Sequence, residues 1–464
     1  MRAHRVGRRT ILRGGAALSA YAALGGGCMT TIDPGPAPGM VGNRPDRSLP
    51  EGTDTIPEIQ HVVVLMMENH SFDNYFGMLD PSLGFSLDAS GAPTNACPDG
   101  MGNHVRAFHM PSACQLDTEP SQAWDASHTS FADGRNDGFV LGSGPVAMGY
   151  WDESDLPFYW SLARNFTLAS RWFSSTLAQT YPNRRFLLAG TAAGIVSTDA
   201  STLSLPPPPN GTIFQRLDAH GITWRDYASD LPGIAIIPSI PRTRSTVGTI
   251  ASFMSDAAVG TLPSVSFVDP PFVAAGSEEN PQDIRVGERF ASQIIQAVMH
   301  GPGWPHTLLV WLYDEHGGYY DHVPPPAAIP PDDILPMVAG PAAYDRYGFR
   351  VPAVIVSPYA KPGYVSDTVR DHTAVLRFIE RKWNLGALTL RDASADDLSD
   401  CLDLSTPHLL VPPMLAAPAL DAAMPPACTP GMPGTIPPAD AVIMGSADAT
   451  RIGRALSEIL RSVG

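Results

Sequence analysis

The strongest constraint on the fold is a set of continuous apolar runs that alternate with helical patterns along the chain. The runs show no alternation of apolar and polar residues, as expected for central strands covered on both faces. They lie at residues 61–67, 264–269, 307–315 and 351–359, with 222–229 as a further strand candidate. Apolar residues recur at helical spacing in residues 156–166, 286–300 and 371–385. The alternation predicts an α/β fold of three layers, with a largely parallel central sheet and helices on both faces.

Two long segments interrupt this alternation. Residues 91–149 are polar and rich in glycine, which indicates a loop excursion over the edge of the sheet and a lid or pocket wall. Residues 395–448 are rich in proline and alanine and are expected on the surface, and residues 449–463 have the pattern of an amphipathic helix. We expect residues 57–464 to form a single domain with long loop excursions.

The first 28 residues have the pattern of an export signal. Five arginines precede residue 14, and the apolar run 14–27 is too short to span a membrane. "GRRTIL" (7–12) is a twin-arginine pattern, with an ordinary basic leader as the alternative. Cys28 after "LGGG" is typical of lipid attachment, although the leucine lies one position further upstream than usual. We therefore expect a periplasmic, cell-surface or secreted protein, with or without a lipid anchor on the membrane, and a tether at 29–56.

Export to an oxidising compartment favours disulfides between the four remaining cysteines. Pairing Cys97 with Cys114 and Cys401 with Cys428 closes two short loops, so we expect these two local bridges. Free buried thiols are the alternative.

The charge balance excludes one class of partner. The formal net charge is −16, and the only lysines are Lys361 and Lys382. A chain this acidic is a poor ligand for phosphate backbones, so no nucleic acid is expected. The oligomeric state stays open.

Acidic and amide side chains follow three of the predicted strands directly. Glu68 and Asn69 follow the first, Asp269 the second, and Asp314 and Glu315 the third. Because the carboxyl ends of parallel strands lie along one rim, these oxygen ligands are expected to meet and to hold a hard metal ion. Any one of these carboxylates by itself is more often a solvated loop residue.

Thr180 is a candidate nucleophile, because it precedes "YPNRRFLLAG" at the expected start of a helix. Backbone NH groups and the helix dipole favour a phosphate at that position, whereas a simple N-cap is the commoner role of threonine there. His128, His316 and His322 lie in acidic or glycine-rich stretches and are candidates for proton transfer.

Four motifs, in this order, resemble those of the bacterial phosphoesterase family. They are "ENHSFDNYFG" (68–77), "YPNRRFLLAGT" (181–191), "DEHGGYYDHVPPP" (314–326) and the stretch from 349 to 383. The family includes phospholipases C that cleave phosphatidylcholine and acid phosphatases. Its fold resembles that of alkaline phosphatases and sulfatases, which agrees with the α/β prediction.

The resemblance implies that Glu68, Asn69, Asp314 and Glu315 hold one divalent or trivalent metal ion whose identity the sequence leaves open. Thr180 would contact the same ion as the nucleophile and would form a phosphothreonine ester. The resemblance also implies that His128 lies near the leaving group and that His322 is the second proton-transfer residue. His316 falls at a variable place of its motif and is assigned to substrate binding.

One position departs from the family pattern, because Asn280 stands before Pro281 where the family often has histidine. Asparagine cannot carry a proton, so Asn280 is expected to bind a substrate oxygen while His322 takes the acid–base role. The expected substrate is a phosphodiester such as a phospholipid, with phosphomonoesters as the alternative. A non-catalytic binding protein on the same fold is the rival hypothesis, and a sulfatase is disfavoured because the Cys/Ser-x-Pro-x-Arg pattern is missing.

Overall fold

The structure is a computed structural model that describes residues 40–114, 120–274, 276–420, 428 and 441–443. The predicted export signal, Cys28, the first part of the predicted tether and the predicted helix at 449–463 lie outside the described residues. No helix of the described part is both long and apolar enough to cross a membrane.

An eight-stranded sheet forms the centre of the domain, in the order β12-β6-β11-β10-β1-β9-β7-β8. Its strands are β1 (His61–Met67), β6 (Thr167–Ala169), β7 (Trp224–Ala228), β8 (Val247–Thr249), β9 (Val265–Val268), β10 (Thr307–Tyr313), β11 (Ala353–Val356) and β12 (Val365–Ser366). β1 lies between β9 and β10 and runs parallel to both, whereas β11 is antiparallel to its two neighbours. All seven residues of β10 are buried, as the continuous apolar run predicts.

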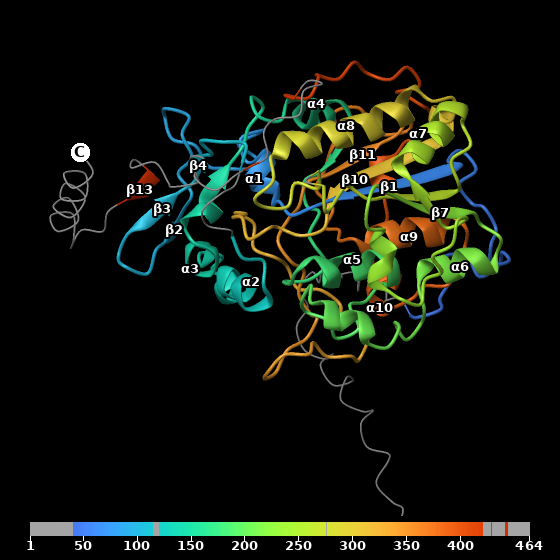
Figure 1. The fold of residues 1–464 in the computed structure, drawn as a ribbon, viewed down its shortest axis with the longest axis horizontal. Helices are drawn as coiled ribbons and strands as arrows, with labels where there is room; N and C mark the ends of the chain where they lie inside the picture. The colour runs from blue at the N-terminus through green and yellow to red at the C-terminus, as the bar shows by residue number, and fades with distance from the viewer. Residues whose placement is uncertain (1–39, 115–119, 275, 421–427, 429–440, 444–464) are drawn as a thin grey trace, which may run out of the picture. The chain divides into compact units, whose positions relative to one another are not determined.

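Helices cover both faces of this sheet (Figure 1). One group consists of α4 (Pro157–Asn165), α7 (Ile250–Val259) and α8 (Ile284–His300), and α8 packs against both of the others. The other consists of α5 (Thr180–Ala189), α6 (Ile213–Ala219), α9 (Thr373–Lys382) and α10 (Leu390–Ala393). The predicted three-layer α/β fold is therefore confirmed.

The predicted loop excursion contains short elements of its own. A small sheet joins β2 (Ala96–Pro98), β3 (His104–Arg106) and β13 (Val442–Ile443), and β4 (Phe108–His109) pairs with β5 (Gly149–Tyr150). The helices of the excursion are α2 (Trp124–Phe131) and α3 (Phe139–Ser143), and α1 (Phe72–Phe76) precedes the excursion in the chain. Short 3-10 turns are η1 (Ala132–Gly134), η2 (Pro145–Met148), η3 (Ala200–Ser204), η4 (Gly233–Ile236), η5 (Trp304–His306) and η6 (Ser399–Cys401).

The described part of the predicted tether packs on the domain. Asn384 is the anchor, because its side-chain amide donates to the carbonyl oxygens of Asp46, Leu49 and Pro50. Gly52 and Thr55 add backbone hydrogen bonds to the end of α9. Residues 46–55 are thus held on the same body as the sheet.

The predicted cysteine pairing is wrong. The structure joins Cys114 to Cys428, and Cys97 and Cys401 are buried thiols without a disulfide. The prediction favoured short loops, but the bridge closes a separation of 314 residues. The fold brings the long C-terminal segment back to the excursion, where β13 also pairs with β3, and this proximity cannot be read from spacing.

Candidate active site

The ends of β1 and β10 place the predicted metal ligands side by side. The two strands are parallel with Met67 opposite Tyr313, so Glu68 and Asp314 follow at the same level. Glu68, Asn69, Asp314 and Glu315 are all nearly or fully buried. Gly317 lets the turn after β10 pack directly against the backbone of Asn69, because a Cβ at this residue would lie 1.9 Å from the backbone oxygen of Asn69.

A buried arginine on α5 joins the strand ends. Arg184 lies 3.2 Å from Asp314, and 3.5 Å from both Glu68 and Asp269. Its guanidinium also donates to the carbonyl oxygens of Met66 and Met67 at 3.2 Å. The prediction that three strands deliver carboxylates to one rim is therefore confirmed by contacts to a single side chain.

Carboxyl and amide groups converge at this rim. The side-chain nitrogen of Asn69 donates to Asp314 Oδ1 at 2.8 Å and to Glu315 Oε1 at 3.1 Å. The amide thus joins the residue after β1 to the two carboxyl groups after β10, and a rotated amide would offer its oxygen to a cation instead. Carboxylate and amide oxygens are the ligands of hard cations, so the residues present fit the metal ion that the resemblance implies.

The charge balance of the rim points the same way. Burial raises the pKa of Glu68 and Glu315 well above its usual value and that of Asp314 to about 6. Neighbouring carboxylates add to the rise at Glu68 and Glu315, and the Arg184 charge opposes it at Glu68 and Asp314. One guanidinium is too little positive charge for this group of carboxyls, which a bound cation would hold ionised.

Thr180 is the first residue of α5, and Gln179 is the N-cap. The predicted position at a helix N-terminus is confirmed, and the alternative that Thr180 is itself the N-cap is not. Residues four apart on a helix lie on one face, about 5–6 Å apart at Cβ, so Thr180 is one turn from the Arg184 side chain that contacts the rim. Thr180 is nearly buried at this end of the helix.

His128 lies on α2, in the wall of an open cleft of about 760 Å³. Thr176 and Leu177, a few residues before Thr180, line the same cleft. The His128 ring packs on Trp124, and its Nδ1 donates to the carbonyl oxygen of Trp124 at 2.8 Å. Because Nδ1 is engaged, Nε2 is the atom left for a substrate.

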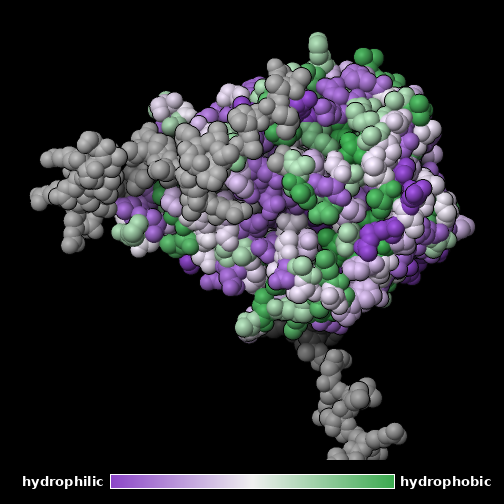
Figure 2. Space-filling view, in the orientation of Figure 1, coloured by the Kyte–Doolittle hydropathy of each residue, from purple (hydrophilic) through white to green (hydrophobic). Residues whose placement is uncertain are grey.

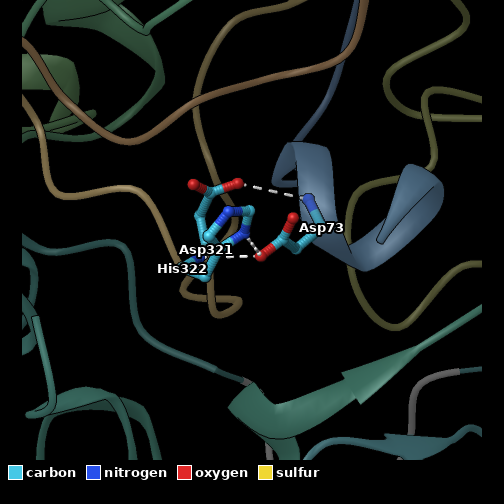
Figure 3. Close-up of side chains that lie close together, drawn as sticks. All are labelled: Asp73, Asp321 and His322. Atoms are coloured by element: carbon cyan, nitrogen blue, oxygen red, sulfur yellow. Dashed lines mark hydrogen bonds and ion pairs between the residues drawn. The ribbon is translucent and has the colours of Figure 1, made fainter. Parts of the chain in front are cut away.

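His322 belongs to a closed network with Asp73, Asp321 and Arg350. Figure 3 shows the Asp73, Asp321 and His322 side chains of this network. His322 Nδ1 donates to Asp73 Oδ2 at 2.7 Å, and its backbone NH donates to the same oxygen at 2.7 Å. Burial disfavours the charged imidazole, but the hydrogen bond and charge of Asp73 outweigh this and raise the pKa of His322. With Nδ1 held by a carboxylate, the ring is fixed in orientation for proton transfer at Nε2.

Asp73, Asp321 and His322 offer ligand atoms within 4.8 Å of one another, a grouping that can bind a metal. The guanidinium of Arg350 is the cation of this group, since it donates to Asp321 at 2.8 Å and to Asp73 at 2.9 Å. The remaining terminal nitrogen of Arg350 donates to two backbone oxygens. The positive charge that this cluster needs is therefore already supplied.

The two predicted substrate-binding residues lie in different surroundings. Asn280 is nearly buried, and its Oδ1 accepts a 2.7 Å hydrogen bond from Tyr319. His316 is fully buried against Phe349, and burial lowers the pKa of its imidazole to about 3. The assignment of His316 to substrate binding gains no support from this position.

Sequence reasoning missed four residues of the site. Asp73 holds His322, Arg350 pairs with Asp73, Arg184 joins the rim, and His372 donates from Nε2 to the backbone oxygen of Asp314 at 2.7 Å. All four lie inside the motifs quoted above, but their contacts join residues far apart in the chain. Buried charge within those motifs was the available signal.

A sequence profile of the Phosphoesterase family matches residues 59–386, and the chain therefore belongs to this family. It is 27% identical to phospholipase C B of Mycobacterium tuberculosis over 86% of each chain. It is 28% identical to non-specific phospholipase C3 of Arabidopsis thaliana, covering 77% of this chain and 76% of that one. Hemolytic phospholipase C of Pseudomonas aeruginosa is 28% identical, over 85% of this chain and 62% of the relative.

Among solved structures, human ectonucleotide pyrophosphatase/phosphodiesterase 5 matches with a TM-score of 0.35 and 11% identity, covering 53% of this chain and 94% of that one. Family and relatives together make the chain a hydrolase of phosphoric esters.

Proposed function

We propose that the protein is an exported, metal-dependent phosphodiesterase of the phospholipase C type that works through a phosphothreonine intermediate. The observation that carries the proposal is the group of buried carboxyls of Glu68, Asp269 and Asp314 around Arg184, which lies one helical turn after Thr180 on α5. The names of the relatives support a phospholipid as substrate, and the sequence of residues 1–28 supports export.

The metal would be held by Glu68, Asn69, Asp314 and Glu315. Bound there, a divalent or trivalent cation lowers the pKa of the threonine hydroxyl and neutralises charge on the phosphoryl group. The remaining work falls to side chains of this chain, beginning with the Thr180 hydroxyl.

Thr180 Oγ, after losing its proton to solvent, attacks phosphorus as the bond between phosphorus and the leaving oxygen breaks, which produces a phosphothreonine ester and a free alcohol. A protonated histidine supplies the proton that the leaving oxygen needs. Water then attacks the phosphothreonine, giving its proton to the same histidine and restoring Thr180. His128 in the cleft wall and His322 on the Asp73 carboxylate are the two candidates, and each has its Nδ1 engaged and its Nε2 left for this transfer.

Substitution of Thr180 tests the proposal on two soluble reporters, nitrophenyl phosphorylcholine as the diester and nitrophenyl phosphate as the monoester. Thr180→Ala is expected to lower kcat/KM for the diester by on the order of 10³-fold or more, because the covalent route is lost. Thr180→Ser keeps the hydroxyl and is the matched control, expected to retain most of the activity.

Each outcome has one reading. If the wild type prefers nitrophenyl phosphate to nitrophenyl phosphorylcholine, the protein is an acid phosphatase rather than a phospholipase C. Full activity of Thr180→Ala would remove Thr180 from its role, and inactivity of the wild type on every phosphate ester after metal addition would contradict the proposed function.

A further inference from the structure

The loop between β10 and β11 carries an exposed apolar tip. Ile334, Leu335 and Met337 are 39%, 65% and 54% exposed, within four consecutive positions. Figure 2 shows hydrophobic surface at the lower edge of the molecule, where this loop runs in Figure 1. An apolar group of this kind on a soluble domain marks an interaction surface.

The loop is held in place on the segment that follows α5. The backbone NH of Met337 donates to the carbonyl oxygen of Gly194 at 2.8 Å. A Cβ at Gly194, whose φ is +89°, would lie 3.3 Å from the backbone oxygen of Leu335 and from Met337 Cγ. Further along, Tyr344 donates to the carbonyl oxygen of Ile195 at 2.7 Å. The apolar tip is therefore presented by a fixed loop next to the helix that carries Thr180.

The same loop forms one wall of the cleft that contains His128. Small and apolar residues of the loop line this wall: Val338, Ala339, Pro341, Ala342 and Ala343. Phe131 and Leu177 line the same cleft, as do the charged residues Asp125, Asp133, Asp345 and Arg346. The cleft wall follows the exposed tip directly in sequence, so a lipid in the surface that the tip touches would lie next to the apolar part of this wall.

The charge of the loop indicates which kind of lipid surface it can contact. No lysine, arginine or histidine lies between Ala327 and Asp345, whereas Asp332 and Asp333 directly precede the exposed tip. Arg346 after the loop is engaged over the Phe131 ring. With a formal net charge of −16 on the chain, an anionic membrane would repel this face. A zwitterionic lipid surface, whose outermost groups are ammonium cations, complements Asp333 and accepts the apolar side chains.

We propose that Ile334, Leu335 and Met337 dock the protein on a zwitterionic lipid surface and place the cleft over the lipid to be cleaved. The role of the docking, which is to bring the cleft to its substrate, rests on the proposed phospholipase function. The docking itself does not require hydrolysis and can be measured without it.

Vesicle binding by the Thr180→Ala protein tests this without hydrolysis. The probe is a vesicle of phosphatidylcholine alone, and the measurement is the fraction of protein that sediments with it. Leu335→Ser/Met337→Ser in the same background is expected to weaken binding by about tenfold or more, because two apolar side chains leave the lipid. Adding phosphatidylserine to the vesicles is expected to weaken binding of the parent.

Val411→Ser/Met414→Ser is the matched control, because these side chains are 86% and 95% exposed in a different segment. It is expected to bind like the parent. With Thr180 restored, Leu335→Ser/Met337→Ser should lose about tenfold in hydrolysis of vesicle phosphatidylcholine and keep its rate on soluble nitrophenyl phosphorylcholine within about twofold.

Three outcomes would overturn the proposal: no vesicle binding by the parent, equal binding by the Leu335/Met337 variant, or a dimer in solution that this variant dissociates. Vesicle binding that persists in a wild-type protein without activity on any phosphate ester would overturn the proposed function and leave the docking surface standing.

Discussion

Two buried clusters of acidic residues lie in this domain, and they balance their charge differently. In the rim at the ends of β1, β9 and β10, three carboxyl groups (Glu68, Asp269 and Asp314) share the guanidinium of Arg184, and the buried Glu315 follows Asp314 directly. In the second cluster, Arg350 pairs with only two carboxylates, Asp73 and Asp321, and His322 adds a further donor.

The difference separates a structural ion pair from a site for a ligand. Arg350 donates to carboxylate and backbone oxygens from all three of its nitrogens, so the second cluster is complete without any addition. At the rim, several carboxyl groups share Arg184, and burial raises the pKa of Glu68 and Glu315 well above its usual value, toward their neutral forms. Our proposal therefore assigns a cation to the rim, where carboxyl groups outnumber positive charges, and the orientation of His322 to the balanced cluster.

The largest expected effect is that of metal removal. Chelation followed by desalting should lower kcat on nitrophenyl phosphorylcholine by on the order of 10³-fold, because the charge that stabilises the transition state is removed. Activity should return on titration with a divalent or trivalent ion. If the enzyme keeps its full rate after exhaustive chelation, the rim does not hold a metal ion that catalysis needs.

Removal of Arg350 tests the second cluster. Arg350→Gln leaves Asp73 and Asp321 buried without their cation, and should lower the free energy of unfolding by about 3–5 kcal/mol. Denaturant unfolding measures this value, and added metal ion should not restore it. Arg164→Gln, which breaks an exposed pair with Glu153, is the control and should cost about 1 kcal/mol or less.

A smaller effect is expected for Asp73→Asn, which leaves the rim intact. Losing the carboxylate that orients His322 should lower kcat by about 10–100-fold. Since Asp73 raises the pKa of His322, the variant imidazolium loses its proton at lower pH, and the alkaline limb of the kcat profile should move to lower pH.

A double variant tests whether Asp73 acts by positioning His322. In a His322→Ala background, Asp73→Asn should have almost no further effect on kcat, because Asp73 is proposed to act only by orienting the His322 imidazole. Additive losses would mean that Asp73 acts on catalysis independently of His322.

The rim could be predicted from the sequence, because its geometry follows from short-range rules. A continuous apolar run predicts a buried strand, parallel strands end along one rim, and Glu68 and Asp314 each follow such a run directly. Thr180 at the start of α5 could likewise be placed from Pro182 and the helical pattern after it.

The second cluster could not be predicted, because it joins residues that only the finished fold brings together. Asp73 and Arg350 are separated by 277 residues, and neither follows a buried strand. The predicted bridges Cys97–Cys114 and Cys401–Cys428 were wrong for the same reason. Loop length favours local bridges, but the return of the C-terminal segment brings Cys428 to Cys114. Burial of His316 against Phe349 also depends on a tertiary contact that its motif does not reveal.

Metal analysis of three purified proteins tests the central claim most directly. The account predicts about one bound ion per chain in the wild type and in Asp73→Asn, and almost none in Asp314→Asn, with all three folded by circular dichroism. Equal metal content in the wild type and Asp314→Asn, or loss of the ion in Asp73→Asn alone, would contradict the assignment of the rim as the metal site.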